Sequence, residues 1–328
     1  MLPAIEQELR RQIKRLDAGA TRPFHDMLAY HMGWTHGKGA TARAGKRIRP
    51  LLLLLVSDAA GSRWKDALPA AAAMEIIHNF SLVHDDIQDN SPTRRGRPAL
   101  WTLHGSALAI NAGDALLTIA NQAMLDLEKR YPPAVVVEAA RILQDACLDL
   151  TRGQYLDLSH QDTNRLTLRN YWTMIGGKTA ALLSACTEIG AILGGAGGKW
   201  RAGYREFGRL LGAAFQVQDD ILGIWGDESA TGKSAAIDLA EGKLSLPVVY
   251  GLRQRGRFAR SWTNARTRPK RTTALRHMLE KEGAYDYSAR QARRLTNQAL
   301  AQLRSLRPQG PAGAALAELT EQLLGRQT

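Results

Sequence analysis

The stretch His78–Pro98, HNFSLVHDDIQDNSPTRRGRP, joins an apolar helix end to a dense set of charges. It follows Ala70–Ile77, an Ala-rich apolar run without a helix breaker, so we expect it to be the end of a buried helix. On such a helix Asp85 and Asp89 lie one turn apart and share a face. Carboxylates in this arrangement repel each other and destabilise the helix unless a cation lies between them.

A cluster of arginines follows this acidic helix end. Arg94, Arg95 and Arg97 come soon after the last carboxylate, and prolines on both sides of the cluster predict that it lies in a loop. Carboxylates that suit a hard cation, followed directly by guanidinium groups, are what a metal-bridged diphosphate requires. The alternative interpretation is a solvated, charged helix end with a basic loop.

The composition predicts an all-α fold. Of the 328 residues 45% are hydrophobic but only 6% are aromatic, and Ala and Leu are prominent, which favours helices over strands. The sequence lacks the alternating runs of β-branched and aromatic residues that would indicate a sizeable sheet. It also shows no internal repeat of solenoid period.

The formal net charge of +13 and the pI of about 10.0 indicate an anionic partner. The charge does not coincide with patterns of nucleic-acid-binding motifs, so we expect small phosphorylated substrates and no nucleic acid. Thr179–Ala196 is the longest apolar run, but Glu188 and several glycines favour a buried core helix over membrane insertion. Cys147 and Cys186 lie in apolar helical contexts without metal-like spacing, which favours a reduced, cytoplasmic protein.

A second cationic group occurs at Gly45–Pro50, GKRIRP. Lys46, Arg47 and Arg49 directly precede the apolar run Leu51–Val56, so they fall at the start of a helix. The helix macrodipole disfavours cations there, whereas a glycine entry, backbone N–H groups and Lys or Arg side chains together form an anion site. A surface basic cluster is the alternative interpretation.

A second pair of aspartates interrupts an apolar helix at Phe215–Gly223, FQVQDDILG. Asp219 and Asp220 follow Gln216 by about one turn. We interpret this segment as the pseudo-symmetric partner of the first acidic helix end, facing a common cavity. Upstream, two glycines precede Lys178 in an apolar helix, which predicts a kink or a close backbone approach to a ligand.

Several other polar positions bear on the site. Gln154 and Asp157 share one face of an apolar helix, either as a satisfied core pair or as pocket-lining residues. Lys233 and Lys243 lie in glycine-containing loops, and Arg253–Arg271 contains eight Lys or Arg residues without an acid, which predicts a solvated loop. Because the acidic segments offer oxygen ligands with no nearby Cys, we expect Mg²⁺ rather than zinc.

Six motifs resemble, in order and spacing, those of the trans-isoprenyl diphosphate synthases (polyprenyl synthetases): GKRIRP, HNFSLVHDDIQD with TRRGRP, GQYLDL, GGKTA, FQVQDDILG and TGKSAAIDLAEGKLSLP. The resemblance runs from Gly45 to the C-terminal helices. It implies an isoprenoid synthase-type helical bundle around a central cavity, formed by a single synthase domain over residues 1–328. It also implies a cytoplasmic homodimer.

The resemblance assigns roles by position. The implied ligands of Mg²⁺, up to three ions bridged by the substrate, are Asp85, Asp89 and Asp219. The carboxylates that support them are Asp86 and Asp220. The implied partners of the allylic diphosphate are Arg94, Lys178 and Lys233, and the polar side chains near the allylic carbocation are Thr179 and Gln216. The implied isopentenyl diphosphate site consists of Lys46, Arg49, His78 and Arg95, and a further substrate-binding candidate is Lys243.

The implied function is Mg²⁺-dependent head-to-tail (1′-4) condensation of isopentenyl diphosphate with an allylic diphosphate by a prenyltransferase. Cations stabilise the departing diphosphate, oxygen dipoles stabilise the carbocation, and an apolar helical wall excludes water. In this family the residues five and four before the first Asp help to set product length, and here they are Phe80 and Ser81. The bulky Phe80 suggests a short product, and we expect C20 (geranylgeranyl) over C15 (farnesyl).

Gly223 departs from the family's pattern, because the second acidic motif usually ends there in a third Asp. We expect metal binding to persist, since Asp219 and Asp220 remain and Asp227 is nearby. A class I terpene cyclase would share the fold and the acidic site but lack the isopentenyl diphosphate site that GKRIRP indicates. A non-catalytic synthase subunit is a further alternative. A basic nucleic-acid-binding protein would leave the paired aspartates unexplained, because they repel phosphate without a metal.

Overall fold

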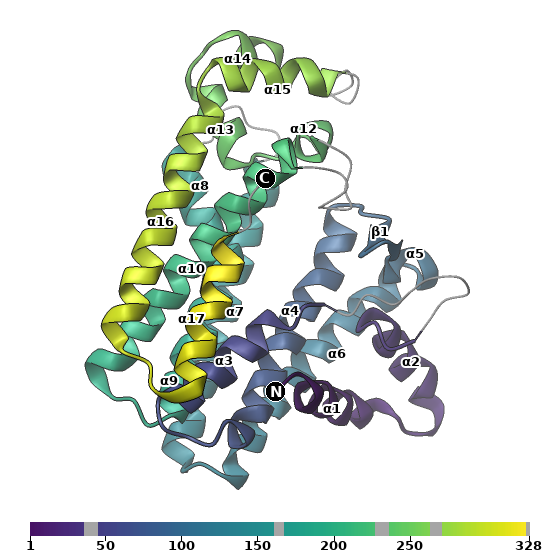
Figure 1. The fold of residues 1–328 in the computed structure, drawn as a ribbon. Coiled ribbons are helices and arrows are strands. Elements are labelled where there is room, and N and C mark those ends of the chain that lie inside the picture. Colours follow the sequence, from purple (N-terminus) through teal and green to yellow (C-terminus); the bar gives the residue numbers. More distant parts are fainter. Residues whose placement is uncertain (36–44, 161–166, 227–235, 263–270, 326–328) are drawn as a thin grey trace. The chain divides into compact units, whose positions relative to one another are not determined.

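The computed structural model describes residues 1–35, 45–160, 167–226, 236–262 and 271–325. The α-helices of this part, labelled in Figure 1, are α1 (Leu2–Ile13), α2 (Arg22–His31), α3 (Ile48–Ala59), α4 (Leu68–Gln88), α5 (Leu100–His104), α6 (Ser106–Leu125), α7 (Pro133–His160), α8 (Leu168–Ile175), α9 (Ala181–Leu193), α10 (Gly198–Trp225), α12 (Ile237–Glu241), α13 (Leu246–Arg253), α14 (Arg257–Ser261), α15 (Thr272–Lys281), α16 (Ala284–Leu306) and α17 (Gly310–Leu324). The described strands form one hairpin, β1 (Thr93–Arg94) and β2 (Arg97–Pro98). The all-α prediction is confirmed.

The described chain divides into two compact units. The first contains residues 1–144 and 186–198, and the second contains residues 145–185 and 199–328. Each unit contains one of the two acidic segments, since α4 belongs to the first and α10 to the second. No helix in the described ranges is long and apolar enough to cross a membrane.

Helix α4 is the central helix of the first unit and packs on α1, α3 and α6. Its residues Ala70–Ala73 are fully buried, because small side chains let the neighbouring helices approach closely. Gly113 on α6 serves the same purpose. A Cβ at this position would lie 2.2 Å from Nε2 of His84 on α4, so a larger residue would have to displace the His84 ring.

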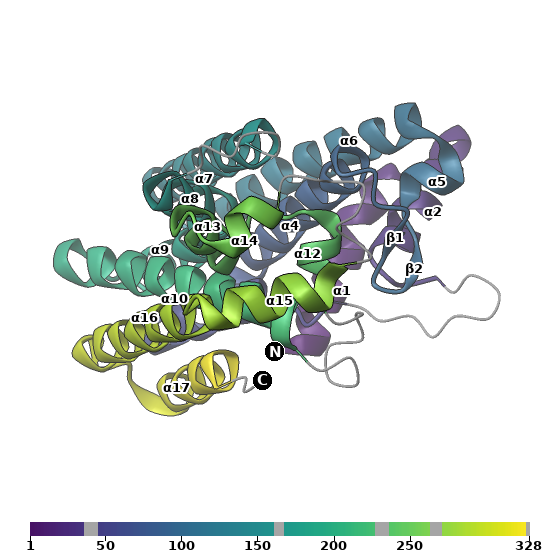
Figure 2. The same ribbon diagram turned by 90° about the horizontal axis from the view of Figure 1, so that it is seen from above.

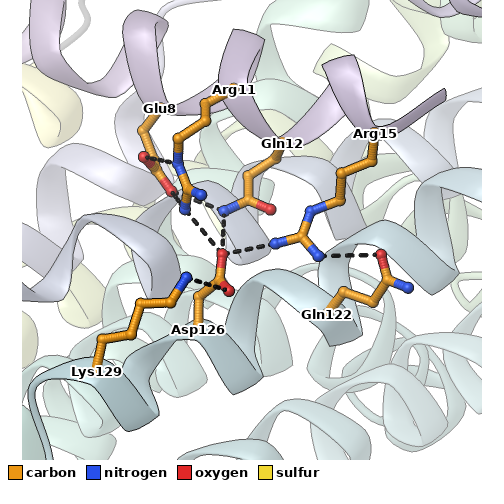
Figure 3. A network of polar contacts seen from close by, with 7 residues as sticks. All are labelled: Glu8, Arg11, Gln12, Arg15, Gln122, Asp126 and Lys129. Carbon is orange, nitrogen blue, oxygen red and sulfur yellow. Dashed lines mark hydrogen bonds and ion pairs between the residues drawn. The ribbon is translucent and has the colours of Figure 1, made fainter. Parts of the chain in front are cut away.

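A polar network fastens α1 to the end of α6 (Figure 3). The carboxylate of Asp126 accepts hydrogen bonds from Arg11, Gln12 and Arg15 of α1 at 2.6–2.9 Å and from Lys129 at 3.1 Å. Burial alone would raise the pKa of Asp126, but the hydrogen bonds outweigh it and hold this pKa well below its usual range. The network therefore joins α1 to the end of α6 within the first unit.

In the second unit α10, α16 and α17 run side by side, as both views show (Figures 1 and 2). Gln302 of α16 donates to the carbonyl of Gly203 on α10 at 3.1 Å, and Gln218 of α10 donates to the carbonyl of Leu324 on α17 at 2.7 Å. Helix α16 also packs on α13 and α15. These contacts fix the helix that carries the second pair of aspartates.

Two local predictions need correction or refinement. The arginine cluster Arg94–Arg97 forms a tight hairpin rather than a loop, because Arg95 and Gly96 adopt left-handed turns with φ of 55° and 74°. The first part of Arg253–Arg271 contains the short helix α14 and buries Phe258, so it is not all loop, but its arginines Arg253, Arg255, Arg257 and Arg260 are exposed as predicted. The residues 263–270 lie outside the described ranges.

Candidate active site

The end of α4 carries three aspartates in different environments. Asp85 is half-buried, Asp86 is buried and Asp89 is exposed. Carboxylates at a helix C-terminus are opposed by the macrodipole, so this placement stabilises the helix only if cations compensate for it. Such an arrangement is typical of a site that binds a cation rather than of a helix selected for stability.

Arg94 compensates for the buried member of this group. Its Nε donates to Asp86 Oδ1 at 2.8 Å, and its Nη2 forms an ion pair with the same oxygen. Burial raises the pKa of Asp86, and the Arg94 guanidinium partly offsets that rise. Asp86 therefore anchors the hairpin to α4 through Arg94.

The three cations of the GKRIRP motif separate into different roles. Arg47 is buried, adopts a left-handed conformation with φ of 49°, and binds Glu6 at 2.6 Å and Glu75 at 2.8 Å. Arg47 therefore stabilises the first unit. Lys46 is exposed and Arg49 is half-buried, so these two can reach a ligand.

The hairpin and the GKRIRP motif approach each other at Gly45. A Cβ on Gly45 would lie 2.8 Å from Nη2 of Arg95, so the glycine makes room for that guanidinium. Arg97 instead lies 3.9 Å from the Tyr30 ring and donates to backbone carbonyls of α2 and its C-terminal extension, which fastens the hairpin. Of the hairpin arginines, Arg94 and Arg95 are thus placed for an anion, whereas Arg97 is structural.

Two histidines lie beside these cations. Burial lowers the pKa of His78 well below its usual value, and Arg49, Arg95 and Arg94 lower it further. Burial with Arg95 and Arg94 lowers the pKa of His31 to about 3. Both imidazoles are therefore neutral at pH 7 and can donate as well as accept hydrogen bonds. His31, which the sequence analysis missed, lines a small open pocket with the hairpin arginines.

The residues expected to set product length lie one turn before the aspartates. The Phe80 ring packs edge-on against His84 with centroids 4.9 Å apart, and the Ser81 hydroxyl donates to the His78 carbonyl at 2.8 Å. Both side chains are half-buried. Phe80 lies about 140° around the helix from Asp85, so it forms a side wall rather than part of the acidic face.

The glycine pair of the second unit lies in a π-helical turn, Gly176–Ala180, between α8 and α9. A Cβ on Gly177 would lie 2.4 Å from the Asp149 carbonyl oxygen, and one on Gly153 would lie 2.2 Å from the Lys178 nitrogen. The predicted close approach therefore exists, but it joins this turn to α7 rather than to a ligand. The π-turn changes the helical register, a feature common at functional sites, and presents Lys178 and Thr179.

A chain of hydrogen bonds runs from this turn to the second acidic motif. The Thr179 hydroxyl donates to Gln216 Oε1 at 2.6 Å, and Gln216 Nε2 donates to Asp220 Oδ1 at 2.9 Å. Asp220 Oδ2 also accepts from the Tyr171 hydroxyl at 2.7 Å and the Leu246 backbone N–H at 2.8 Å. Asp220 is thus a structural carboxylate that orients Gln216, while Asp219 beside it is half-buried.

Two lysines of the second unit rest on carboxylates. Lys178 Nζ lies 2.6 Å from Asp157 Oδ2, so Asp157 is paired with a lysine of the π-helical turn. Lys243 Nζ lies 3.9 Å from Asp238 Oδ2. Burial alone would lower the pKa of Lys243, but Asp238 and three further carboxylates raise it, so this lysine is charged. Lys233 and Asp227 lie outside the described residues.

The donor set of both acidic segments fits Mg²⁺. In the described part of the chain no three His, Cys, Asp or Glu side chains form a group that could hold a metal ion. Mg²⁺ is usually bound through one or two carboxylates together with substrate phosphates, so a complete protein cage is not required. The acidic oxygens of Asp85, Asp89 and Asp219 meet that requirement with hard donors.

The sequence analysis missed several residues that contact the charged side chains of the site. Glu75 was detectable, because it is a lone acid within the Ala-rich run of α4 and a buried carboxylate needs a cation. Tyr171 and Asp238 gave no comparable signal, since each becomes significant only through a contact with a residue distant in the sequence.

A family profile for polyprenyl synthetases matches residues 37–281. The (2E,6E)-farnesyl diphosphate synthase of Mycobacterium tuberculosis (strain H37Rv) is 36% identical over 334 aligned positions, which cover 98% of this chain and 90% of that protein. The chain belongs to the polyprenyl synthetase family. The geranylgeranyl diphosphate synthase of the same organism is 41% identical over 239 positions, covering 72% of this synthase and 67% of that protein. The crystal structure of a polyprenyl synthetase from Streptomyces coelicolor A3(2) aligns with a TM-score of 0.89 at 34% identity, covering 98% and 96% of the two chains.

These likenesses confirm the family and the all-α isoprenoid synthase fold that the six motifs predict. The synthase is a prenyltransferase of the short-chain trans-isoprenyl diphosphate type, and its family uses Mg²⁺. The relatives comprise both farnesyl and geranylgeranyl diphosphate synthases, so the comparisons leave the product length of this synthase to its own residues.

Proposed function

We propose that the synthase condenses isopentenyl diphosphate head to tail (1′-4) with an allylic diphosphate and releases a C20 product, geranylgeranyl diphosphate. The observation that carries the proposal is the chain Thr179–Gln216–Asp220 beside Lys178. Thr179 follows Lys178 on the π-helical turn, and its hydroxyl contacts the side-chain oxygen of Gln216 on α10. Oxygen dipoles suit an allylic carbocation, and the ammonium group suits the diphosphate that leaves it.

The roles of the charged residues follow from their partners. Asp85, Asp89 and Asp219 would hold Mg²⁺, up to three ions bridged by the substrate, which supply positive charge opposite the departing diphosphate when bound. Arg94 and Lys178 bind the allylic diphosphate after leaving Asp86 and Asp157, together with Lys233. Lys243 follows α12 and lies among carboxylates of the second unit, which include Asp219 and Asp220. Asp86 and Asp220 hold Arg94 and Gln216 in place.

The isopentenyl diphosphate is bound by Lys46, Arg49, His78 and Arg95. Gly45 supports this assignment, because its missing side chain lets Arg95 reach the motif that carries Lys46 and Arg49. The neutral imidazole of His78 donates a hydrogen bond without adding charge. The alkene of this substrate then attacks the carbocation, and the new cation loses a proton to the released diphosphate to form the product double bond, so no side-chain nucleophile is required.

Phe80, Ser81 and His84 support the C20 assignment. The edge-on packing of Phe80 against His84 forms a rigid wall one turn below the acidic face, and the smaller Ser81 leaves room beside it. Phe80→Ala removes the phenyl ring and leaves a methyl group, so this variant should make a longer product.

Product analysis tests the proposal. Purified protein is incubated with isopentenyl diphosphate and dimethylallyl, geranyl or farnesyl diphosphate, with and without Mg²⁺, and the products are sized by chromatography. We expect a Mg²⁺-dependent C20 product. A C15 product would overturn only the length assignment. Absence of condensation with every primer would overturn the catalytic assignment and favour a non-catalytic synthase subunit.

We further propose that residues 1–328 act as one synthase domain and assemble as a cytoplasmic homodimer. The single domain is supported by the alignment of 98% of the chain with one synthetase structure. The dimer is supported by exposed apolar side chains on α5 and α6, Leu103, Leu108, Ile110 and Leu125. The cytoplasmic location is supported by the unpaired thiols of Cys147 and Cys186. Light scattering of the wild type and Leu108→Glu measures the oligomeric state, and a wild-type monomer would overturn the dimer.

A further inference from the structure

Helix α10 has a vacant position where α4 has a carboxylate. On α4, Asp85 is followed one turn later by Asp89, so the two share a face. On α10, the residue one turn after Asp219 is Gly223. A Cβ on Gly223 would lie 2.3 Å from Asp238 Oδ2 and 2.5 Å from its Cγ. The carboxylate of Asp238 therefore occupies the space that a side chain at position 223 would need.

Asp238 reaches this space from α12 and contacts Lys243, whose side chain is 44% exposed. Asp238 itself is 5% exposed, and its backbone carbonyl accepts from the Lys243 N–H at 2.9 Å. Its carboxylate also lies 3.9 Å from Lys243 Nζ. A buried carboxylate is costly unless it is paired, so the glycine, the lysine and the aspartate form one arrangement in which each requires the others.

We propose that Asp238 supplies, beside Asp219, the second metal-binding carboxylate of the second unit, in the space left by Gly223. This inference rests on the proposed Mg²⁺–diphosphate site. It assigns to the second unit the same pair of acidic oxygens that α4 provides, but from two helices instead of one. With Asp238 as a ligand, the second acidic motif can end in Gly223 and the second unit still binds the metal.

An exchange of the two positions tests the proposal. The double variant Gly223→Asp/Asp238→Ala moves the carboxylate to α10, and the matched control Gly223→Ala/Asp238→Ala removes it while relieving the same steric overlap. Asp238→Asn keeps the size of the side chain and removes its charge, and Asp126→Asn serves as a control at a half-buried carboxylate of the first unit. Calorimetric titration of Mg²⁺ in saturating inorganic pyrophosphate measures metal affinity, and melting in EDTA verifies folding.

We expect Asp238→Asn to weaken Mg²⁺ binding about tenfold or more, the range seen for residues that support a metal. The double variant Gly223→Asp/Asp238→Ala should recover most of the Mg²⁺ affinity of the wild type. Neither the control Gly223→Ala/Asp238→Ala nor the single variant Gly223→Asp should reach that affinity. The proposal is overturned if Asp238→Asn binds Mg²⁺ like the wild type, or if the two double variants behave alike. If an exchange variant does not fold, Asp238→Asn decides. Product formation by the wild type tests the proposed function separately from these titrations.

Discussion

The ends of α4 and α10 carry the same pair of aspartates but stabilise it in different ways. In both, the second aspartate is buried and the first is half-buried. Asp86 on α4 is held by a guanidinium that is one-third exposed, whereas Asp220 on α10 is held by three neutral donors in the interior. The partner of Asp86 is therefore accessible to solvent, whereas Asp220 is fixed by hydrogen bonds to neighbouring elements of its own unit.

The largest expected effects are on catalysis, at the first aspartate of each pair. Asp85→Asn and Asp219→Asn each remove a hard ligand from the metal site, so kcat should fall on the order of a hundredfold or more. Steady-state rates at several Mg²⁺ concentrations measure this loss. Asp89→Asn should resemble Asp85→Asn, and a variant of either position with normal kcat would remove it from the metal site.

The second aspartates should differ in their effect on stability. Asp220→Asn places an amide opposite hydroxyl and N–H donors in the core and should lower the free energy of unfolding by about 3 kcal/mol. Asp86→Asn should lower it by only about 1.5 kcal/mol, because Arg94 can turn towards water. Urea denaturation of both variants measures the difference. Equal losses would show that the two acidic segments are held alike.

Asp126 provides a reference carboxylate that has no substrate role. Its folded-state pKa is depressed, so it contributes stability above its unfolded pKa of about 4 and loses that contribution as the pH falls below it. Asp126→Asn should cost about 2 kcal/mol at pH 7 and progressively less below pH 4, while kcat remains unchanged. Denaturation across this pH range, with parallel rate measurements, would reveal any dependence of catalysis on the network of Figure 3.

The smallest expected effect is at the hydroxyl that ends the hydrogen-bond chain on the second unit. Thr179→Val keeps the shape of the side chain and removes its oxygen, so kcat should fall about tenfold, equal to about 1.4 kcal/mol, with little change in KM. Thr179→Ser keeps the hydroxyl and should retain most of the activity. If Val and Ser variants have the same kcat, the oxygen does not stabilise the carbocation.

The helical pattern and the paired aspartates could be read from the sequence because both depend on local spacing. The α4 helix follows from its apolar run, and the shared face of Asp85 and Asp89 follows from the helical period. The role of each arginine in GKRIRP could not be read in this way. Arg47 is buried and forms ion pairs with Glu6 and Glu75, which lie far away in the sequence. The other two cations of the motif, Lys46 and Arg49, are more accessible.

The glycines show the same limit. Two glycines before Lys178 predict a close approach, but the sequence does not say to what, and the structure identifies α7. In the sequence, Gly223 indicates that the second acidic motif lacks a ligand, because the motif contains residues of one helix only. The carboxylate of Asp238 becomes visible only when α12 is placed against α10.

A crystal structure of the protein with Mg²⁺ and inorganic pyrophosphate would test the central claim most directly. We expect Asp85, Asp89, Asp219 and Asp238 to face the metal, while Asp220 keeps Tyr171 and Gln216 as partners and Arg94 turns from Asp86 to the anion. Metal ions bound by Asp86 and Asp220, with Asp85 and Asp219 turned away, would contradict the division between catalytic and structural aspartates.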